Sequence, residues 1–147
     1  MISKILVPTD GSKSAQRAAR YAIDLAKQLK CAIIILSVID NPTIMDRPVS
    51  DNVHQILEPV EDYLRKAAED AVREIKGICD ENGIQSTVLL TAGQPSEEIA
   101  KEAESANADL IVMGSHGRSA LAAVFLGSVT SSLIHKETKT PVLIVRR

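Results

Sequence analysis

Hydrophobic and polar positions follow two patterns that take turns along this chain. Short apolar runs without strict alternation predict buried strands, whereas apolar positions three and four residues apart predict helices. The strands are expected at residues 2–8, 32–38, 87–91, 110–113 and 141–145. The helices are expected at 15–30, from 57 to a stop at Asn82-Gly83, from 95 to 106, and at 128–136.

The region between Ile39 and His54 fits neither pattern. Asn41-Pro42 and Arg47-Pro48 mark it as a long loop, to which the pattern assigns no role. Pro59 follows near the start of the next helix, where proline is tolerated if it falls within the first turn.

Strands that alternate with helices predict an α/β fold. We expect a three-layer sandwich in which a five-stranded parallel sheet has helices on both faces. A strand order of 3-2-1-4-5 is assumed at this point, and it makes the first and fourth strands neighbours. The length of 147 residues suits a single domain that spans residues 1–147.

Composition narrows the classes of partner. Aromatic residues are scarce and the net charge is −2, so neither stacking platforms nor a basic surface for nucleic acid or an anionic membrane is expected. No apolar run approaches the roughly 20 residues of a membrane span, and no signal-peptide pattern opens the chain. Cys31 and Cys79 lack CxxC spacing, so we expect reduced, buried thiols and a cytoplasmic protein.

Glycines and small hydroxyl residues gather behind the fourth apolar run. Gly114 and Gly117 can shape a turn whose backbone N–H groups surround an anion, because glycine accepts positive φ and has no side chain to block approach. Gly127 to Thr130 have the composition of a helix start, where unpaired N–H groups also attract phosphate. The alternative is that these glycines only form a tight turn and a helix entry.

Thr9-Asp10 follows the first strand and is expected at the same edge of the sheet as the glycine loop. Ligands of parallel sheets bind at the carboxyl ends of the strands, so these two loops predict one phosphate site. Asp10 is interpreted either as a ligand of Mg²⁺ or Mn²⁺, direct or through water, or as the N-cap of the first helix. His116 can contact phosphate, and Arg118 and Lys136 can add positive potential, although each also suits an ordinary surface position.

Catalytic residues are not apparent. The sequence lacks the GxxxxGK[ST] phosphate loop, the GxGxxG dinucleotide fingerprint and the GxSxG nucleophile elbow. Its histidines and cysteines show no zinc-ligand spacing. The residues therefore favour binding over turnover.

Taken together, these residues make the chain resemble the universal stress protein family, in the subgroup that binds ATP. The family's pattern is a glycine, two residues, a glycine, nine residues, and then glycine with Ser or Thr; Gly114, Gly117, Gly127 and Ser128 match it without a gap. The resemblance runs from Ile5-Leu6-Val7-Pro8-Thr9-Asp10 to Pro141-Val142-Leu143-Ile144-Val145 and so covers essentially the whole chain. It implies a Rossmann-like fold of the adenine-nucleotide hydrolase type, with strand order 3-2-1-4-5.

The same resemblance implies where a nucleotide would be held. Pro8, Thr9 and Asp10 would line it, with Asp10 near the metal, and the backbone of Val38 would meet the adenine. Met113 would pack near the sugar and base. The ribose and phosphates would be held by the remaining motif residues, which are Gly114, His116, Gly117, Gly127, Ser128, Val129 and Thr130.

Family members commonly dimerise through antiparallel pairing of the last strand, so the resemblance implies a homodimer through Val142 to Val145. We expect an ATP-binding stress-response protein in which nucleotide occupancy orders residues 114–130 and changes the surface that partners meet. The sequence names neither the downstream protein partner nor the trigger. Two alternatives stay open: a slow metal-dependent ATP hydrolase that uses Asp10, and an interaction scaffold that needs no nucleotide.

Overall fold

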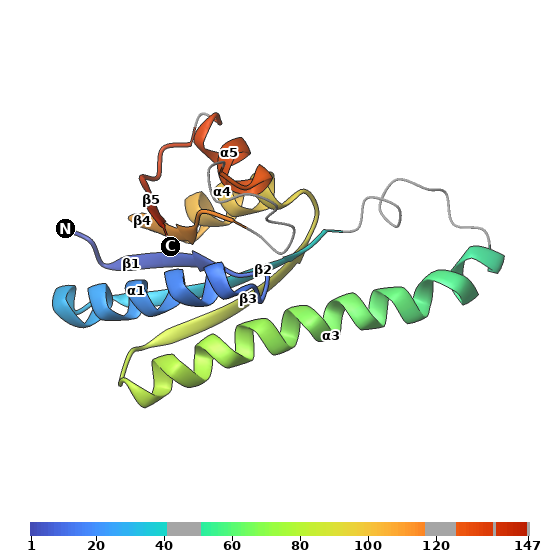
Figure 1. The fold of residues 1–147 in the computed structure, drawn as a ribbon, viewed down its shortest axis with the longest axis horizontal. Coiled ribbons are helices and arrows are strands. Elements are labelled where there is room, and N and C mark those ends of the chain that lie inside the picture. The colour runs from blue at the N-terminus through green and yellow to red at the C-terminus, as the bar shows by residue number, and fades with distance from the viewer. Residues whose placement is uncertain (41–50, 117–125, 137, 147) are drawn as a thin grey trace.

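A computed structural model describes residues 1–40, 51–116, 126–136 and 138–146, with the backbone alone at 51–59. Strands and helices alternate through these residues (Figure 1). The elements are β1 (Lys4–Pro8), α1 (Lys13–Leu29), β2 (Ala32–Ile39), α3 (Asp51–Glu81), β3 (Ser86–Ala92), α4 (Pro95–Ser105), β4 (Leu110–Gly114), α5 (Ser128–Ile134) and β5 (Val142–Val145).

The strands form one five-stranded parallel sheet with the order β3-β2-β1-β4-β5. The strand order expected from the sequence is thereby confirmed. β1 is the central strand: it pairs with β2 up to Pro8 opposite Leu36, and with β4 where Leu6 lies beside Ile111. The chain segments that follow β1 and β4 therefore leave the sheet at neighbouring positions.

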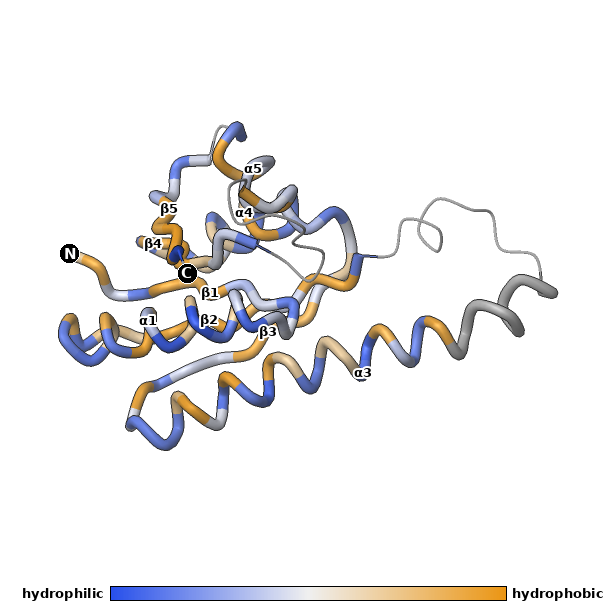
Figure 2. Tube along the Cα trace, viewed as in Figure 1, coloured by the Kyte–Doolittle hydropathy of each residue, from blue (hydrophilic) through white to orange (hydrophobic). Residues whose placement is uncertain are grey.

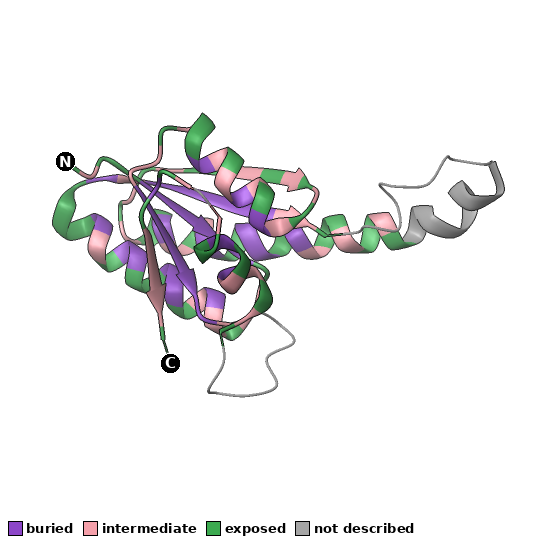
Figure 3. Ribbon diagram, turned by 90° about the horizontal axis from the view of Figure 1, so that it is seen from above, coloured by how far each residue is buried: buried purple, intermediate pink, exposed green. Residues whose placement is uncertain are grey.

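Helices cover both faces of the sheet, and the buried residues concentrate in the central strands and on the inner sides of the helices (Figure 3). On the face of α1 and α3, the packed residues include Ile5, Val7, Ile33, Ile35, Val72 and Ile75. On the face of α4 and α5, they include Leu6, Leu36, Ile99, Ile111 and Leu133. The expected three-layer sandwich is confirmed.

Alanines allow α1 to lie close against the sheet. Ala18, Ala19, Ala22 and Ala26 are fully buried, at 0% exposure each. Their methyl groups fill the space under the helix without holding it away from the strands. The helix ends at Leu29 and is capped by Lys30, whose φ of 54° is left-handed and whose N–H donates to the carbonyl oxygen of Ala26.

The start of α3 differs from the expectation. The helix begins at Asp51, so the loop expected to reach His54 ends earlier, and Pro59 lies beyond the first turn. Hydrophobic spacing did not indicate this start because the residues from Asp51 to Gln55 are mostly polar. Proline has no N–H, so the helix lacks the bond that residue 59 would otherwise donate to the carbonyl of residue 55.

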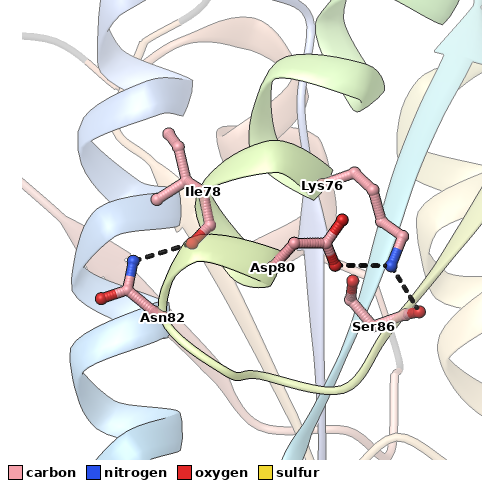
Figure 4. Close-up of polar contacts among 5 residues, drawn as sticks. All are labelled: Lys76, Ile78, Asp80, Asn82 and Ser86. Carbon is pink, nitrogen blue, oxygen red and sulfur yellow. Dashed lines mark hydrogen bonds and ion pairs between the residues drawn. The ribbon is translucent and has the colours of Figure 1, made fainter.

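Side chains fix the turn that leads from α3 into β3 (Figure 4). Asn82 Nδ2 donates to the carbonyl oxygen of Ile78 at 2.7 Å, and Gly83 takes a φ of 68°. Lys76 Nζ lies 2.9 Å from Asp80 Oδ1 and 3.5 Å from the carbonyl oxygen of Ser86. The expected stop at Asn82-Gly83 is confirmed, and Lys76 ties the last turns of the helix to the start of an edge strand.

Cys31 and Cys79 are buried free thiols, as expected from the sequence. Burial raises the pKa of both thiols, because a thiolate is poorly solvated away from water. At the other end of the chain, α5 stops at Ile134, two residues short of the expected Lys136. None of the described helices is both long and apolar enough to span a bilayer.

Candidate functional site

The loop after β1 is shaped by hydrogen bonds to its own backbone. The Thr9 N–H donates to the carbonyl oxygen of Leu36 at 2.8 Å, and the Thr9 hydroxyl oxygen accepts from the Gly11 N–H at 3.1 Å. Gly11 has a φ of 80°, a conformation that side chains disfavour. The chain can therefore turn sharply from the sheet edge into α1.

Asp10 is not the N-cap of α1, so that interpretation is wrong. The N-cap is Ser12, whose Oγ accepts from the Ala15 N–H at 3.1 Å. Asp10 is exposed, and its Oδ1 accepts from the Ser12 N–H at 2.9 Å, which closes a turn just before the helix. The carboxylate is thus held by the loop and stands at the solvent side of the carboxyl edge.

The segment after β4 packs directly on the first turn of α1. A Cβ added to Gly114 would lie 2.8 Å from the carbonyl oxygen of Ser14, so only glycine fits between strand and helix. The His116 N–H donates to Ser14 Oγ at 3.3 Å. Ser14 thus joins the two loops that the sequence placed at one site, a role that no motif indicated.

His116 is the one motif side chain with an unpartnered buried nitrogen among the described residues. Its Nδ1 lies 2.6 Å from Ser115 Oγ, which orients the ring. Its Nε2 is buried and has no hydrogen-bond partner in the described part of the chain. A buried polar atom without a partner is costly, so this nitrogen suits a site that a polar ligand completes.

The second half of the glycine motif is joined to the first. The Gly127 N–H donates to the carbonyl oxygen of Ser115 at 2.6 Å, and the buried Thr130 hydroxyl donates to that of Gly114 at 2.9 Å. Gly127 is the N-cap of α5 and offers no side-chain cap to the first turn. The start of α5 is therefore held against the end of β4 with its first N–H groups uncapped by a side chain.

The backbone of Val38 points past the end of β1. Leu36 accepts a hydrogen bond from Thr9, so its backbone groups face β1, and those of Val38, two residues on, face the same side. The pairing of β1 with β2 ends at Pro8 opposite Leu36, whereas β2 continues to Ile39 beside β3. The N–H and C=O of Val38 are therefore directed over the loop that follows β1.

The remaining expected site residues differ in whether their side chains or only their backbone groups can reach a ligand. Ser128 is exposed, whereas Pro8 and Met113 are buried and Val129 packs against the core, so these three offer mainly backbone. Lys136 Nζ lies 3.8 Å from Glu97 Oε1. Gly117 and Arg118 lie outside the described residues.

The side chains that the structure describes do not form a preassembled metal centre. No group of three or more His, Cys, Asp or Glu side chains in the described ranges is placed to hold a metal ion. A cation near Asp10 would therefore draw most of its ligands from a bound molecule and from water.

Known proteins resemble this chain along its full length. The model of the "Universal stress protein family" matches residues 1–146. Universal stress protein MJ0577 of Methanocaldococcus jannaschii is 35% identical over 158 residues, which cover 100% of this chain and 96% of that protein.

Solved structures agree in fold. The structure of MJ0577 superposes with a TM-score of 0.85 at 34% identity and covers 100% of this chain and 97% of its own. UspA from Lactobacillus plantarum gives a TM-score of 0.85 at 25% identity, with 99% and 98% covered. A universal stress protein in complex with cAMP gives 0.71 at 28% identity, with 99% and 97% covered. Sequence, strand order and site loops together place this chain in the universal stress protein family.

Proposed function

We propose that this protein binds an adenine nucleotide, with ATP as the ligand, at the carboxyl edge of β1, β2 and β4. The observation that carries the proposal is the bond from the Gly127 N–H to Ser115, because it brings the uncapped start of α5 to the end of β4. Uncapped N–H groups at a helix start attract phosphate. The cAMP complex of a relative at 28% identity supports a ligand of this chemistry.

The other parts of a nucleotide have candidate contacts at the same edge. The outward N–H and C=O of Val38 match the donor and acceptor pattern of an adenine edge, and the unpartnered Nε2 of His116 suits a ribose or phosphate oxygen. Asp10 would meet Mg²⁺ or Mn²⁺ carried by the phosphates, and such an ion supplies neutralising charge there. The expected roles of Gly114, Gly117 and Ser128 to Thr130 are part of this proposal.

Nucleotide occupancy is proposed to act as a switch. Binding would favour one arrangement of residues 114–130, to the extent that the nucleotide binds that arrangement more tightly than others. A homodimer formed through β5 would then present the change to a partner protein.

Calorimetry with ATP and Mg²⁺ tests the proposal. Wild-type protein should release or absorb heat of binding, and Gly127→Val should weaken binding strongly, because a branched side chain would stand at the helix start. Gly127 has a φ of −62° and a ψ of 160°, so valine fits the backbone and the fold should survive. Gly77→Ala is the matched control, since the added methyl meets nothing within 4 Å in α3. No heat with millimolar ATP would overturn the proposal.

The metal part has its own test. Asp10→Asn keeps an oxygen to accept from the Ser12 N–H but removes the charge. It should lower the affinity for ATP measured with Mg²⁺ and leave the affinity measured in excess chelator unchanged. An equal loss under both conditions would show that Asp10 acts without a cation.

A further inference from the structure

Ser115 places a hydroxyl group at the end of an apolar strand. β4 is hydrophobic from Leu110 to Met113, and the chain becomes hydrophilic where it leaves the sheet (Figure 2). Ser115 is nevertheless only 4% exposed. A buried hydroxyl needs a hydrogen-bond partner within the protein, because bulk water does not reach it. The partner is the neighbouring ring, since Ser115 Oγ lies 2.6 Å from His116 Nδ1.

The hydroxyl and the ring can share this hydrogen bond in two ways. Either the Ser115 O–H donates to an unprotonated Nδ1, or a protonated Nδ1 donates to Ser115 Oγ. In the second case the hydroxyl proton would have no acceptor among the described residues, where the ring is the only partner of Ser115 Oγ. Buried donors without an acceptor are rarer in proteins than acceptors with an unused lone pair. The first arrangement is therefore favoured, and it places the proton of the neutral ring on Nε2.

A proton on Nε2 narrows the chemistry of the ligand. Nε2 is buried and has no hydrogen-bond partner in the described part of the chain, so its N–H would be a donor without an acceptor. A phosphate oxygen carries negative charge and accepts such a bond more strongly than a neutral ribose hydroxyl does. The ring held by Ser115 thus suits a phosphate group better than a sugar.

The backbone around the ring is fixed by other bonds. The His116 N–H donates to Ser14 Oγ at 3.3 Å, and the Ser115 carbonyl oxygen accepts from the Gly127 N–H at 2.6 Å. Both bonds use backbone groups of residues 115 and 116, so they remain when the Ser115 hydroxyl is removed. The effect of the hydroxyl on the ring can therefore be separated from the folding of the loop.

We propose that Ser115 is a positioning residue of the nucleotide site. Its hydroxyl donates to His116 Nδ1 and thereby keeps the Nε2–H directed at a phosphate oxygen of the ligand. The identity of the ligand rests on the proposed function, whereas the protonation of the ring can be measured with no nucleotide present.

Nitrogen-15 NMR of the histidine rings tests the hydrogen bond in the ligand-free protein. At about pH 8, where histidine side chains are ordinarily neutral, His116 should carry its proton on Nε2. Its Nδ1 should resonate as an unprotonated nitrogen that accepts a hydrogen bond, and Ser115→Ala should move this signal towards that of a free acceptor. The signals of His116 are those missing from His116→Ala. A wild-type ring protonated on Nδ1, or an Nδ1 signal that Ser115→Ala does not move, would overturn the proposal.

A double-mutant cycle on ATP binding tests whether Ser115 acts through the ring. His116→Ala should raise the dissociation constant about tenfold, because a bond to a charged acceptor is lost. Ser115→Ala should raise it several-fold alone and add nothing when combined with His116→Ala, since the ring that it orients is gone. Ser132→Ala removes an exposed hydroxyl from α5 and should leave the affinity unchanged. Losses that multiply in the double variant would show that Ser115 does not act through His116.

Deoxy analogues of ATP separate phosphate from ribose as the partner of His116. If the ring binds a phosphate, His116→Ala weakens binding of ATP, 2′-deoxy-ATP and 3′-deoxy-ATP by the same factor. A loss that disappears with one analogue would place the ring on that hydroxyl and overturn the phosphate assignment. Wild-type protein that binds no nucleotide would refute the proposed function, whereas wild type that binds ATP no more tightly than Ser115→Ala would refute the positioning role alone.

Discussion

At the scale of single residues, two glycines of one motif have different physical reasons. Gly114 is required by packing, because Ser14 of α1 occupies the place of its missing side chain. Gly127 has an ordinary φ of −62° and caps a helix without a side-chain bond. The motif gives both glycines the same role. Only their contacts in the folded structure show that the two are needed for different reasons.

Gly114→Ala is therefore predicted to lower the stability of the fold. The added methyl would lie 2.8 Å from the carbonyl oxygen of Ser14, and such overpacking costs typically about 1–3 kcal/mol. Urea unfolding measures the loss. Gly127→Ala serves as the comparison, with a smaller loss of stability, and equal losses in the two variants would contradict the packing account.

Asp109 makes a pH-dependent contribution to the stability of the fold. It lies at the end of the sheet opposite the candidate site, where β1 begins. Its Oδ2 accepts from the Ser3 N–H at 2.8 Å, from the Ser3 hydroxyl at 3.0 Å and from the Lys4 N–H at 3.1 Å. The bonds from Ser3, followed by the one from Lys4, lower the pKa of this carboxyl below its usual 3.8. The charged form is thus favoured by folding.

Asp109→Asn should destabilise the protein at neutral pH and lose its effect in acid. A pKa lowered in the native state gives stability that is present above the unfolded pKa and disappears as the pH falls through the native one. Urea unfolding of both proteins at about pH 7 and about pH 3 measures the difference, which should shrink at the lower pH. A difference that is the same at both values would show that the charge is not responsible.

At the scale of elements, the backbone groups of the edge strand β5 fall into two sets, one that faces β4 and one that faces outward. Pro141 accepts from the Ile111 N–H, so residues 141, 143 and 145 face β4. Val142 and Ile144 turn their backbone groups outward, where the proposed homodimer would pair them. Because the two sets alternate, a proline substitution can remove an outward N–H while the N–H groups that face β4 remain.

Ile144→Pro is predicted to separate the homodimer while keeping the fold. Proline removes an outward N–H and leaves the bonds to β4 in place, which is why edge strands tolerate it. Sedimentation velocity should show a smaller species with unchanged circular dichroism. Leu143→Pro, which removes an N–H that faces β4, is the contrasting variant and should lose stability. An Ile144→Pro protein of unchanged size would rule out pairing through β5.

At the scale of the whole molecule, the strand order decides where the loops meet. β1 and β4 are neighbours although about 100 residues separate them in the chain, a separation comparable to that of the bonded pair Ser14 and His116 at 102 residues. α1 and α5 then leave these strands to opposite faces. The Thr9–Ser12 loop, the outward backbone of Val38 and the start of α5 consequently share one edge.

ATP binding at this edge should stabilise the entire fold. A ligand that binds only the native state adds about 2.7 kcal/mol when its free concentration is 100 times the dissociation constant. Thermal unfolding with increasing ATP and Mg²⁺ measures the rise in midpoint. Gly127→Val should show a much smaller rise in the unfolding midpoint than wild type. If the midpoint of the wild-type protein does not change with ATP, nucleotide binding is contradicted.

Much of this molecule follows from the sequence alone. Apolar runs and helical spacing indicated every strand and helix of the described chain, because burial on both faces of a parallel sheet leaves a strong periodic signal. The glycine spacing indicated the family, and the places of Thr9-Asp10 and of the glycine loop behind their strands indicated which edge of the sheet carries the candidate site. The start of α3 was misplaced, since its first residues are polar and the signal there is absent.

Tertiary structure decided which residues carry which role. Ser12 rather than Asp10 caps α1, Ser14 joins the two loops, and Val38 turns its backbone outward, because β1 ends before β2 does. These roles depend on contacts between segments that are far apart in the chain, and local hydrophobic periodicity carries no information about such contacts. The sequence thus determined the elements and their chemistry, and the packing of the sheet determined which atoms meet at its edge.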